Sequence, residues 1–407
     1  MREMKDSGIE WIGAIPQNWQ LSKIGSLYTQ RNEKVSDKDY QPLSVTMQGI
    51  LPQLATAAKT DDGDNRKLVR VGDFAINSRS DRRGSCGISP LDGSVSLINI
   101  ILTPRTAMHP GYYNWLFHTT LFADEFYKWG HGIVADLWTT RWQEMKSITV
   151  PVPEYAEQER IAAFLDAECA EINAVLEKTR ASIEEYKKLK QAVIMQAVTK
   201  GVRGDRPMKN SGIEWIGEIS QDFEIVKLKW LCDILDQFRS PVTADKRNQN
   251  ADVLYDYYGA SGAIDKIDSY TIDDHVMLIG EDGANLRMRN LPIMYEINGK
   301  AWINNHAHIL RPKEGVDFHF VFYALEALDL NYYITGSAQP KLSQDNLRNI
   351  WIPITDFSEQ KRIAAYISDV CVGLDRLIAK KQQYLTEIEN YKKSLIYEYV
   401  TGKKEVV

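Results

Sequence analysis

Three arginines close together are the first residues of this sequence whose type and spacing could do chemistry. Arg79, Arg82 and Arg83 follow an alternating apolar run that predicts a strand leading into a loop. Arginine presents a planar fork of donors that pairs with a phosphate or with O6 and N7 of guanine. The stretch is a candidate nucleic-acid contact, and the alternative is an ordinary solvated loop.

Five amide or basic side chains in the second half of the chain are candidates of the same kind. Asn285, Arg287 and Arg289 follow a glycine-containing turn, and Gln339 and Lys341 flank a proline. Amides and arginines are the usual readers of adenine and guanine edges. Each of these residues has the alternative of a turn residue or a fold-supporting donor. The sequence therefore predicts a recognition surface rather than its individual readers.

Two histidines invite a metal-site interpretation, which their pattern does not favour. His306 and His308 alternate along a predicted strand and would point to one side. No third ligand stands at a known spacing, so a polar strand end near DNA is the favoured interpretation. A nuclease built from Asp282, Glu296 and Lys300 is a further alternative, but chance also places two carboxylates and a lysine in so short a stretch.

No motif of a catalytic or nucleotide-binding protein passes its context test. Residues 130–135 fit a loose Gly-x-Gly-x-x-Ala pattern, yet no apolar strand directly precedes them and no helix obviously follows. The sequence contains neither a phosphate-binding Gly-x-x-x-x-Gly-Lys-Ser/Thr loop nor the Asn/Asp-Pro-Pro-aromatic motif of amino methyltransferases. The four cysteines show no Cys-x-x-Cys spacing. We expect a chain with no catalysis, metal or cofactor of its own.

An internal repeat defines the elements that must position these candidates. Residues 7–13, Ser-Gly-Ile-Glu-Trp-Ile-Gly, recur letter for letter at 211–217, an offset of 204. Glu157-Gln-Glu-Arg-Ile-Ala-Ala163 recurs with one change at 359–365, an offset of 202. The chain is therefore two copies of one unit. The middle of each copy, 17–155 and 221–356, barely resembles the other, which suggests two different ligands.

A stripe of mostly apolar residues, advancing by four and three, follows each copy of the second motif. Each stripe spans 33 residues, about 50 Å of helix at 1.5 Å per residue. Such a long stripe is typical of a coiled-coil seam, and the alternative is a pair of ordinary core helices. The predicted seam residues are Leu165, Ile172, Leu176, Ile183, Tyr186 and Val193, followed by Ile367, Leu374, Ile378, Leu385, Ile388 and Leu395.

These patterns together predict the architecture. The fold class is α+β, with two α/β recognition domains, 1–155 and 201–356, separated by long helices at 156–200 and 357–407. We expect the helices to form an antiparallel, pseudo-two-fold coiled coil, because a parallel pair would force the connection after Gly201 back along the whole helix. Two unlike domains on one rod could read two short sites on a duplex, and helix length would set their spacing.

The composition is compatible with DNA binding but does not by itself indicate it. The 407 residues have a net charge of −6. No apolar run approaches the roughly 18 residues of a membrane helix, and no secretion signal stands at the start. We therefore expect a cytoplasmic protein without a membrane partner. Residues 17–153 hold 15 basic and 13 acidic side chains, but residues 222–355 hold 13 and 19. A DNA-binding face in the second segment would have to be a local patch.

The order and duplication of the motifs resemble the specificity subunits of type I restriction-modification enzymes over nearly the whole chain. The likeness rests on Gly-Ile-Glu-Trp-Ile-Gly running into Ile15-Pro-Gln-Asn-Trp19, on Gly72-Asp-Phe-Ala-Ile-Asn77, on Glu157-Gln-Glu-Arg-Ile161 and on Gly336-Ser-Ala-Gln-Pro-Lys-Leu-Ser343. The second copy departs from the first at Ile219-Ser-Gln-Asp-Phe223, which leaves the local turn open.

This resemblance implies a non-catalytic subunit that binds double-stranded DNA, each variable segment reading one half of a bipartite target. The paired helices would space the segments and dock two adenine methyltransferase subunits, and restriction/translocase subunits would complete the assembly. S-adenosylmethionine would bind to the methyltransferase partner, and ATP and magnesium to the restriction partner. The alternative is a coiled-coil scaffold whose end domains bind proteins.

Overall fold

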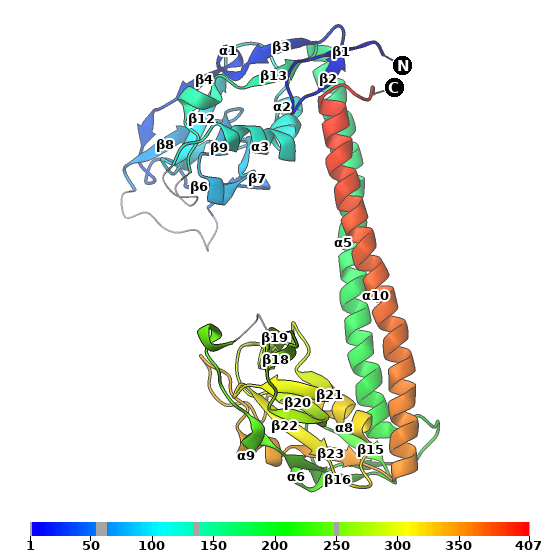
Figure 1. The fold of residues 1–407 in the computed structure, drawn as a ribbon. Coiled ribbons are helices and arrows are strands. Elements are labelled where there is room, and N and C mark those ends of the chain that lie inside the picture. Colours follow the sequence, from blue (N-terminus) through cyan, green and yellow to red (C-terminus); the bar gives the residue numbers. More distant parts are fainter. Residues whose placement is uncertain (1, 54–62, 133–137, 248–251, 407) are drawn as a thin grey trace. The chain divides into compact units, whose positions relative to one another are not determined.

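The chain divides into two compact units in the computed structural model (Figure 1). Residues 1–180 and 383–407 form the first unit, and residues 181–382 form the second. The long helices α5 (Tyr155–Lys200) and α10 (Phe357–Val400) each contribute to both units. The units therefore differ from the four predicted segments, because each joins one variable segment to parts of both helices. The structure describes residues 2–53, 63–132, 138–247 and 252–406.

A frame of short antiparallel strand pairs brackets the variable segment of each unit. In the first unit β1 pairs with β2 and β3 with β13, and in the second β14 pairs with β15 and β16 with β23. A single helical turn, α1 or α6, follows β3 or β16. The bounds are β1 Met4–Asp6, β2 Ala14–Pro16, β3 Gln20–Lys23, α1 Ile24–Leu27, β13 Thr149–Val152, β14 Met208–Asn210, β15 Glu218–Ser220, β16 Glu224–Lys227, α6 Leu228–Leu231 and β23 Trp351–Ile354.

Both variable segments contain the same four-stranded core, although their sequences do not resemble each other. The strand order is β10-β9-β12-β4 in the first unit and β21-β20-β22-β17 in the second, where β18 and β19 extend the sheet to six strands. The core strands are β4 Tyr28–Arg31, β9 Phe74–Asn77, β10 Cys86–Ile88 and β12 Asn99–Pro104, and then β17 Cys232–Ile234, β20 Ile272–Gly280, β21 Met294–Ile303 and β22 Ala307–Pro312.

The remaining elements distinguish the two segments. The first unit has a separate three-stranded sheet, β11-β8-β5, and a hairpin of β6 and β7, and the second has the hairpin of β18 and β19. Thr119, Asp317 and Ser343 cap helices α3, α8 and α9 with side-chain oxygens. The bounds are β5 Lys34–Val35, β6 Leu43–Thr46, β7 Gly49–Pro52, β8 Arg66–Val69, β11 Gly93–Val95, α2 Pro110–Phe117, α3 Thr120–Lys128, α4 Trp142–Met145, β18 Tyr255–Gly259, β19 Gly262–Ile267, α7 Asn285–Met288, α8 Phe318–Ala327 and α9 Gln344–Arg348.

Each unit closes its core with the carboxyl-terminal end of a long helix. In the first unit Leu395 and Val400 of α10 join an aromatic core, and the hydroxyl of Tyr112 donates to the carbonyl of Val400 at 2.8 Å. In the second unit Ile194 and Val198 of α5 join the core. Burial of these apolar ends ties each globular part firmly to the helix pair.

The repeated Glu-Gln motif is buried where each long helix begins. Glu157 accepts a hydrogen bond from the indole N–H of Trp19 at 2.8 Å, whereas Glu359 pairs with Arg206. Arg2 also pairs with Glu157, as its repeat equivalent Arg206 does with Glu359, so the arginine contact is common to both copies. The second copy has Phe223 where the first has Trp19 and lacks only the indole donor. The turn left open by this departure is nevertheless the same, because the amides of Trp19 and Phe223 both donate to the carbonyl three residues earlier.

Within each unit the two long helices run antiparallel, as predicted. In the first unit Lys392 of α10 bonds to Asn173 of α5 at 2.7 Å, and Glu389 pairs with Arg180 at 2.7 Å. In the second unit Lys190 of α5 pairs with Asp375 of α10 at 2.7 Å. In the described part of the chain, no helix is long and apolar enough to cross a membrane.

Candidate nucleic-acid interface

Two loops are paired at equivalent places in the two units. In the first unit the loops are residues 78–85, after β9, and 129–141, here called the first loop pair. The amide of Ser80 donates to the carbonyl of Trp138 and the amide of Thr140 to that of Ser78. Within this pair residues 133–137, and with them part of the Gly-x-Gly-x-x-Ala stretch, lie outside the described residues.

The second unit repeats this arrangement after β20. Residues 281–292 and 335–343 form the second loop pair, in which the amide of Gly283 donates to the carbonyl of Pro340 at 3.0 Å and that of Leu342 to Glu281 at 2.7 Å. All eight predicted DNA-contacting side chains belong to one or other loop pair. The tertiary structure thus brings together candidates that lie about 50 residues apart in the sequence.

The three arginines of the first loop pair are exposed on or beside a single 3-10 turn, Ser80–Arg82. Arg82 lies 3.6 Å from the carboxylate of Asp81, and Arg83 pairs with Asp124 of α3. Exposed ion pairs of this kind contribute little to stability, so either guanidinium can exchange its partner for a phosphate at small cost. Arg79 is joined through its backbone to Thr139 of the opposing loop.

Asn285 and Arg289 make fold-supporting contacts in the second loop pair. The side-chain amide of Asn285 donates to the carbonyl of Leu291 at 3.1 Å and accepts from its N–H at 2.9 Å, which closes the loop. Arg289 donates to the carbonyls of Glu326 and Leu328 at the end of α8, at 2.6 and 2.9 Å, and its burial lowers the pKa of its guanidinium. These contacts match the alternative stated for both residues, and DNA contact by them stays a prediction.

The other three candidates of the second loop pair are exposed. Arg287 makes a 3.3 Å hydrogen bond to the carbonyl of Ile334, and Gln339 lies at the tip of its loop. Lys341 pairs with Glu281 at 3.0 Å while its side chain stays 53% exposed. These side chains keep donors on the surface and are the more accessible of the predicted DNA contacts of this unit.

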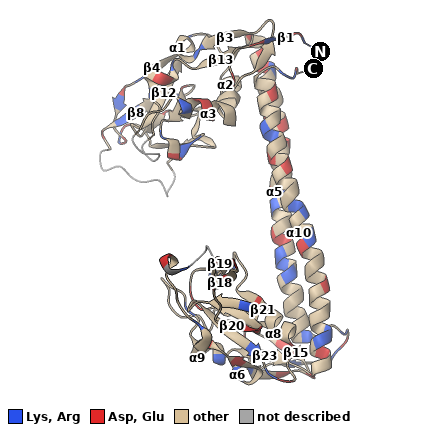
Figure 2. Cartoon of the chain, in the orientation of Figure 1, with Lys and Arg blue, Asp and Glu red and all other residues tan. Residues whose placement is uncertain are grey.

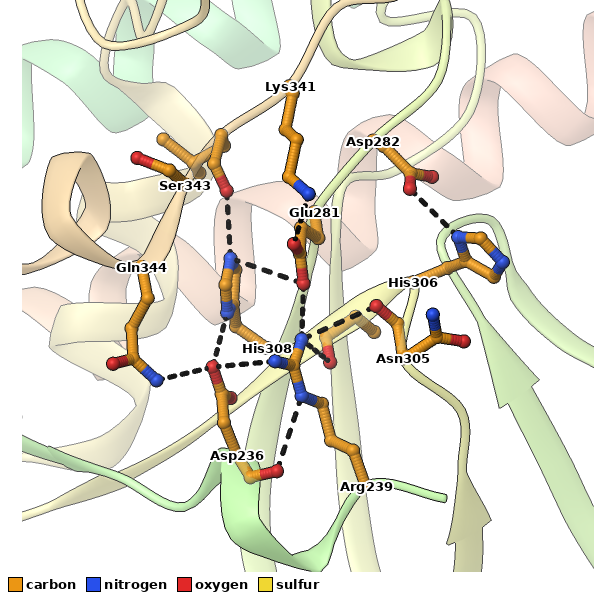
Figure 3. A network of polar contacts seen from close by, with 12 residues as sticks. Asp236, Arg239, Glu281, Asp282, Asn305, His306, His308, Lys341, Ser343 and Gln344 are labelled. Atoms are coloured by element: carbon orange, nitrogen blue, oxygen red, sulfur yellow. Dashed lines mark hydrogen bonds and ion pairs between the residues drawn. The ribbon is translucent and has the colours of Figure 1, made fainter. Parts of the chain in front are cut away.

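A network of charged side chains lies beneath the second loop pair (Figure 3). His308 of β22 is fully buried, with Nδ1 2.6 Å from the carboxylate of Asp236 and Nε2 2.8 Å from the carbonyl of Leu342. Arg239 pairs with both Asp236 and Glu281. His308 and Lys341 stood out in the sequence, but no local pattern predicts that they join one network, because its members lie on segments far apart in the chain.

The two buried carboxylates of this network are held in their charged form. Burial would raise the pKa of Asp236, but hydrogen bonds from His308, Gln344 and the Ile309 amide hold it below its usual value. Burial likewise opposes charge on Glu281, and contacts with Lys341 and Arg239 hold its pKa below the usual value. The network therefore consists of paired opposite charges.

The two histidines of the metal-site alternative do not share one environment. His306 is exposed and bonds through Nδ1 to Asp282 at 2.8 Å, whereas His308 is buried against Asp236. Across residues 2–53, 63–132, 138–247 and 252–406, no three His, Cys, Asp or Glu side chains are grouped so that they could hold a metal ion.

The predicted seam of the long helices faces inward. Leu165, Leu176, Ile183, Ile367, Leu374 and Leu395 are buried, and Ile172, Tyr186, Val193, Ile378, Leu385 and Ile388 are half-buried. Lysines, arginines and acidic residues are interspersed along both helices (Figure 2). The ion pairs described above lie along one flank of this seam.

The opposite flank of the seam exposes apolar side chains. In the first unit these are Val175, 40% exposed, and Tyr391, 54% exposed. In the second unit they are Leu189, 47% exposed, and Leu377, 44% exposed. Each precedes a seam position by one residue, and in an antiparallel pair such positions of both helices lie on the same flank. We call these two pairs the apolar flank.

Comparisons with known proteins give one consistent result. A family model described as "Type I restriction modification DNA specificity domain" matches residues 220–390. The chain is 28% identical over 159 residues to a putative type I restriction enzyme specificity subunit from Haemophilus influenzae, covering 39% of this chain and 37% of that protein. It is 27% identical over 282 residues to the MjaVIII type I restriction enzyme specificity subunit from Methanocaldococcus jannaschii, covering 64% and 63%. Each alignment spans less than two thirds of the relative.

A solved structure shares the fold of the whole chain. The structure is one chain from work on "complex assembly" and "conformational transition of the type I R-M system". It aligns with a TM-score of 0.72 at 14% identity, covering 96% of this chain and 99% of that chain. The sequence matches and the shared fold agree with the duplicated motifs. The chain is thus similar to type I restriction-modification DNA specificity subunits in part of its sequence, and to a chain of the type I R-M system in its fold.

Proposed function

We propose that this chain is the DNA-recognition subunit of a type I restriction-modification enzyme, in which each unit reads one half of a bipartite duplex target. The observation that carries the proposal is the equivalence of the two loop pairs. In both, the first loop follows the equivalent inner strand of the same four-stranded core, β9 or β20, and equivalent backbone hydrogen bonds join it to the second loop, yet the side chains differ. Related frames with unlike loops suit two readers of two unlike base sequences.

The acidic balance of the second segment does not oppose this proposal. The acidic side chains at and beneath the second loop pair lie against basic ones: Asp236 against Arg239, Glu281 against Arg239 and Lys341, and Asp282 against His306. The local surface is therefore not acidic, although residues 222–355 are. A paired patch of this kind, rather than overall charge, is what a local DNA-binding face requires.

We further infer that the apolar flank docks two methyltransferase subunits, one in each unit. Exposed apolar side chains at equivalent heptad positions favour an amphipathic helix as the partner. Since Val175 with Tyr391 and Leu189 with Leu377 repeat one arrangement, the flank favours two copies of the same partner. The opposite flank, occupied by ion pairs, is less suited to an apolar partner.

Catalysis is assigned to partners in this proposal. S-adenosylmethionine would bind to the methyltransferase subunits, and ATP and magnesium to the restriction/translocase subunits. This chain would contribute recognition of double-stranded DNA and the spacing of two half sites, and would act in the cytoplasm with no cofactor of its own.

Methylation mapping tests this function. The chain is expressed with a type I methyltransferase partner in cells that lack such a system, and methyladenine is mapped across the genome. A new two-part motif is expected, and replacing residues 17–155 or 221–356 with those of another specificity subunit should change one half only. No new motif, with the partner shown active through another specificity subunit, would contradict the proposal and favour the protein-binding scaffold.

A further inference from the structure

One buried side chain connects the core sheet of the second unit to its second loop pair. His308 lies on β22, and both of its ring nitrogens face atoms that accept hydrogen bonds, Asp236 Oδ2 at 2.6 Å and the carbonyl of Leu342 at 2.8 Å. A carbonyl can only accept, and so can an ionised carboxylate. Both ring nitrogens therefore lie against acceptor atoms, and the ring bridges strand and loop.

The carboxylate opposite this ring holds further parts of the same region. Asp236, whose side chain is 7% exposed, also accepts from Gln344 at 2.8 Å and from the amide of Ile309 at 3.1 Å. Gln344 is the first residue of α9, directly after the loop. The loop 335–343 is thus fixed at its end by two side chains that share one buried carboxylate (Figure 3).

The other loop of the pair is attached to the same group of charges. Glu281 pairs with Arg239 and with Lys341 of the opposing loop, and its carbonyl accepts from the amide of Leu342. Arg239 in turn pairs with Asp236 at 3.3 Å. The ion pairs therefore link both loops to one another and to the sheet.

The first unit holds its equivalent loops by different chemistry. Register identifies the equivalents: Ile100 pairs with Ile76 on the central strand β9, as His308 pairs with Ile279 on β20. Thr139 similarly takes the place of Lys341 in the bridge between the loops. Both are neutral.

In the first unit, hydrogen bonds from aromatic and hydroxyl side chains hold the loops in place of ion pairs. The hydroxyl of Tyr127 donates to the carbonyl of Asn77 at 3.1 Å, Trp138 donates to the carbonyl of Tyr127 at 2.7 Å, and Thr140 donates to that of Phe126 at 2.8 Å. The first unit is therefore an internal control, since it has the same loop arrangement without a buried histidine.

We propose that His308 is a positioning residue for DNA recognition by the second unit: it holds the second loop pair in register, and only the half site read by that unit depends on it. The inference rests on the proposed function and adds to it the residue that sets the geometry of one reader. A guanidinium or amide must be held within a few tenths of an ångström to distinguish base edges, so looser loops lose discrimination first.

The test compares His308→Gln with His275→Gln in the full chain assembled with its methyltransferase subunits. Glutamine cannot bridge Asp236 and Leu342 as the ring does. His275 undergoes the same chemical change on the neighbouring strand β20, near the end of that strand remote from the loops, where its side chain is 43% exposed and bonds to Glu296 at 2.8 Å. Affinity is measured for the mapped target and for duplexes with either half scrambled.

We expect His308→Gln to lose tenfold or more of its discrimination for the half site of the second unit and to keep its discrimination for the half site of the first unit. His275→Gln should match the wild type at both half sites. Equal discrimination by His308→Gln and wild type at both halves would overturn the positioning role and leave the proposed function intact. A wild-type complex that discriminates at neither half would instead contradict the proposed function.

Amide hydrogen exchange separates loose loops from an unfolded domain. In His308→Gln we expect faster exchange at Gly283 and Leu342, whose amides join the loops, and unchanged protection in β20 and β21. If the protection of those strands is also lost, the same binding assay is carried out with Gln344→Ala, which removes one contact to Asp236. Reduced discrimination at the second half site would then support the role, and unchanged discrimination would reject it.

Discussion

At the scale of single residues, the local environment rather than the residue type distinguishes the predicted DNA contacts from the residues that support the fold. Arg82, Arg83 and Arg289 are the same side chain in comparable loops, and sequence analysis placed them in one class. Arg289 donates hydrogen bonds to two carbonyls at the end of α8, whereas Arg82 and Arg83 are exposed and lie beside carboxylates. Only the exposed pair can turn to a phosphate without breaking the fold.

Replacing Arg82 and Arg83 together by alanine should weaken DNA binding without changing the fold. Each lost phosphate contact lowers the slope of log affinity against log salt by about 0.9. Titration of the assembled complex with target duplex at several salt concentrations measures both quantities. Arg70→Ala is the matched control, since Arg70 is an exposed arginine of the same unit that pairs with Asp92 away from the loops. Unchanged affinity at moderate salt would remove both arginines from the interface.

The charged network makes the stability of the second unit depend on pH. Hydrogen bonds hold the pKa of Asp236 below its usual value despite burial, so its contribution is fully present above the unfolded pKa of about 3.9 and is lost as pH falls through the folded pKa. Asp236→Asn should cost about 3 kcal/mol at pH 7, because it removes the buried carboxylate that contacts both His308 and Arg239. The difference from wild type should shrink below about pH 4.

Denaturant unfolding of the full chain at pH 7, 5, 4 and 3 measures this dependence. Asp256→Asn is the control, because Asp256 pairs with Lys266 on the surface of the same sheet. A wild-type advantage over Asp236→Asn that stays constant between pH 7 and pH 3 would show that ionisation of Asp236 does not contribute to stability.

At the scale of elements, the two halves keep one arrangement through different sequences. The core strands β9 and β20 both pair with the strand that precedes a helix, and that helix, α2 or α8, packs into the core of its unit. Burial of alternating or continuous apolar positions suffices to specify such strands. The loops that follow them carry no such constraint and are free to differ.

The apolar flank gives a prediction at this scale. Val175→Glu with Tyr391→Glu should leave the helices folded, because both side chains are exposed, and should remove one of the two methyltransferase subunits. Leu189→Glu with Leu377→Glu should remove the other, and all four changes should remove both. The stoichiometry of the purified complex, measured by native mass spectrometry, checks this.

The control for the flank uses the same helices and the same charge. Ala174→Glu with Asn390→Glu places glutamates one residue away, on exposed positions outside the flank. This control variant should still bind two methyltransferase subunits. Two bound subunits in the flank variants as well would show that the partner docks elsewhere.

At the scale of the whole molecule, the long helices connect two readers, and their length should set the spacing of the half sites. One extra heptad inserted after Lys178 of α5 and after Glu387 of α10 preserves the seam and adds about 10 Å. This length corresponds to about three base pairs at 3.4 Å each. Methylation mapping should find a longer spacer between unchanged half sites. An unchanged spacer in an active complex would exclude the helices as the ruler.

The features that repeat locally could be predicted from the residues alone. The letter-for-letter recurrence of residues 7–13 and the four-three stripes revealed two units, two long helices and their antiparallel packing. Such patterns are readable because one turn of helix or one motif already contains the whole signal. The equivalent motifs also carried the resemblance to specificity subunits.

Only the tertiary structure decided what depends on distant contacts. The common four-stranded core of the two variable segments is defined by hydrogen bonds between strands, and many sequences satisfy it. Asp236 and His308 are 72 residues apart, and nothing in their local sequence announces that they meet. Arg289 and Arg287 differ only in which carbonyls lie within reach. Long-range packing therefore fixes the geometry of recognition, whereas local periodicity fixes the frame that carries it.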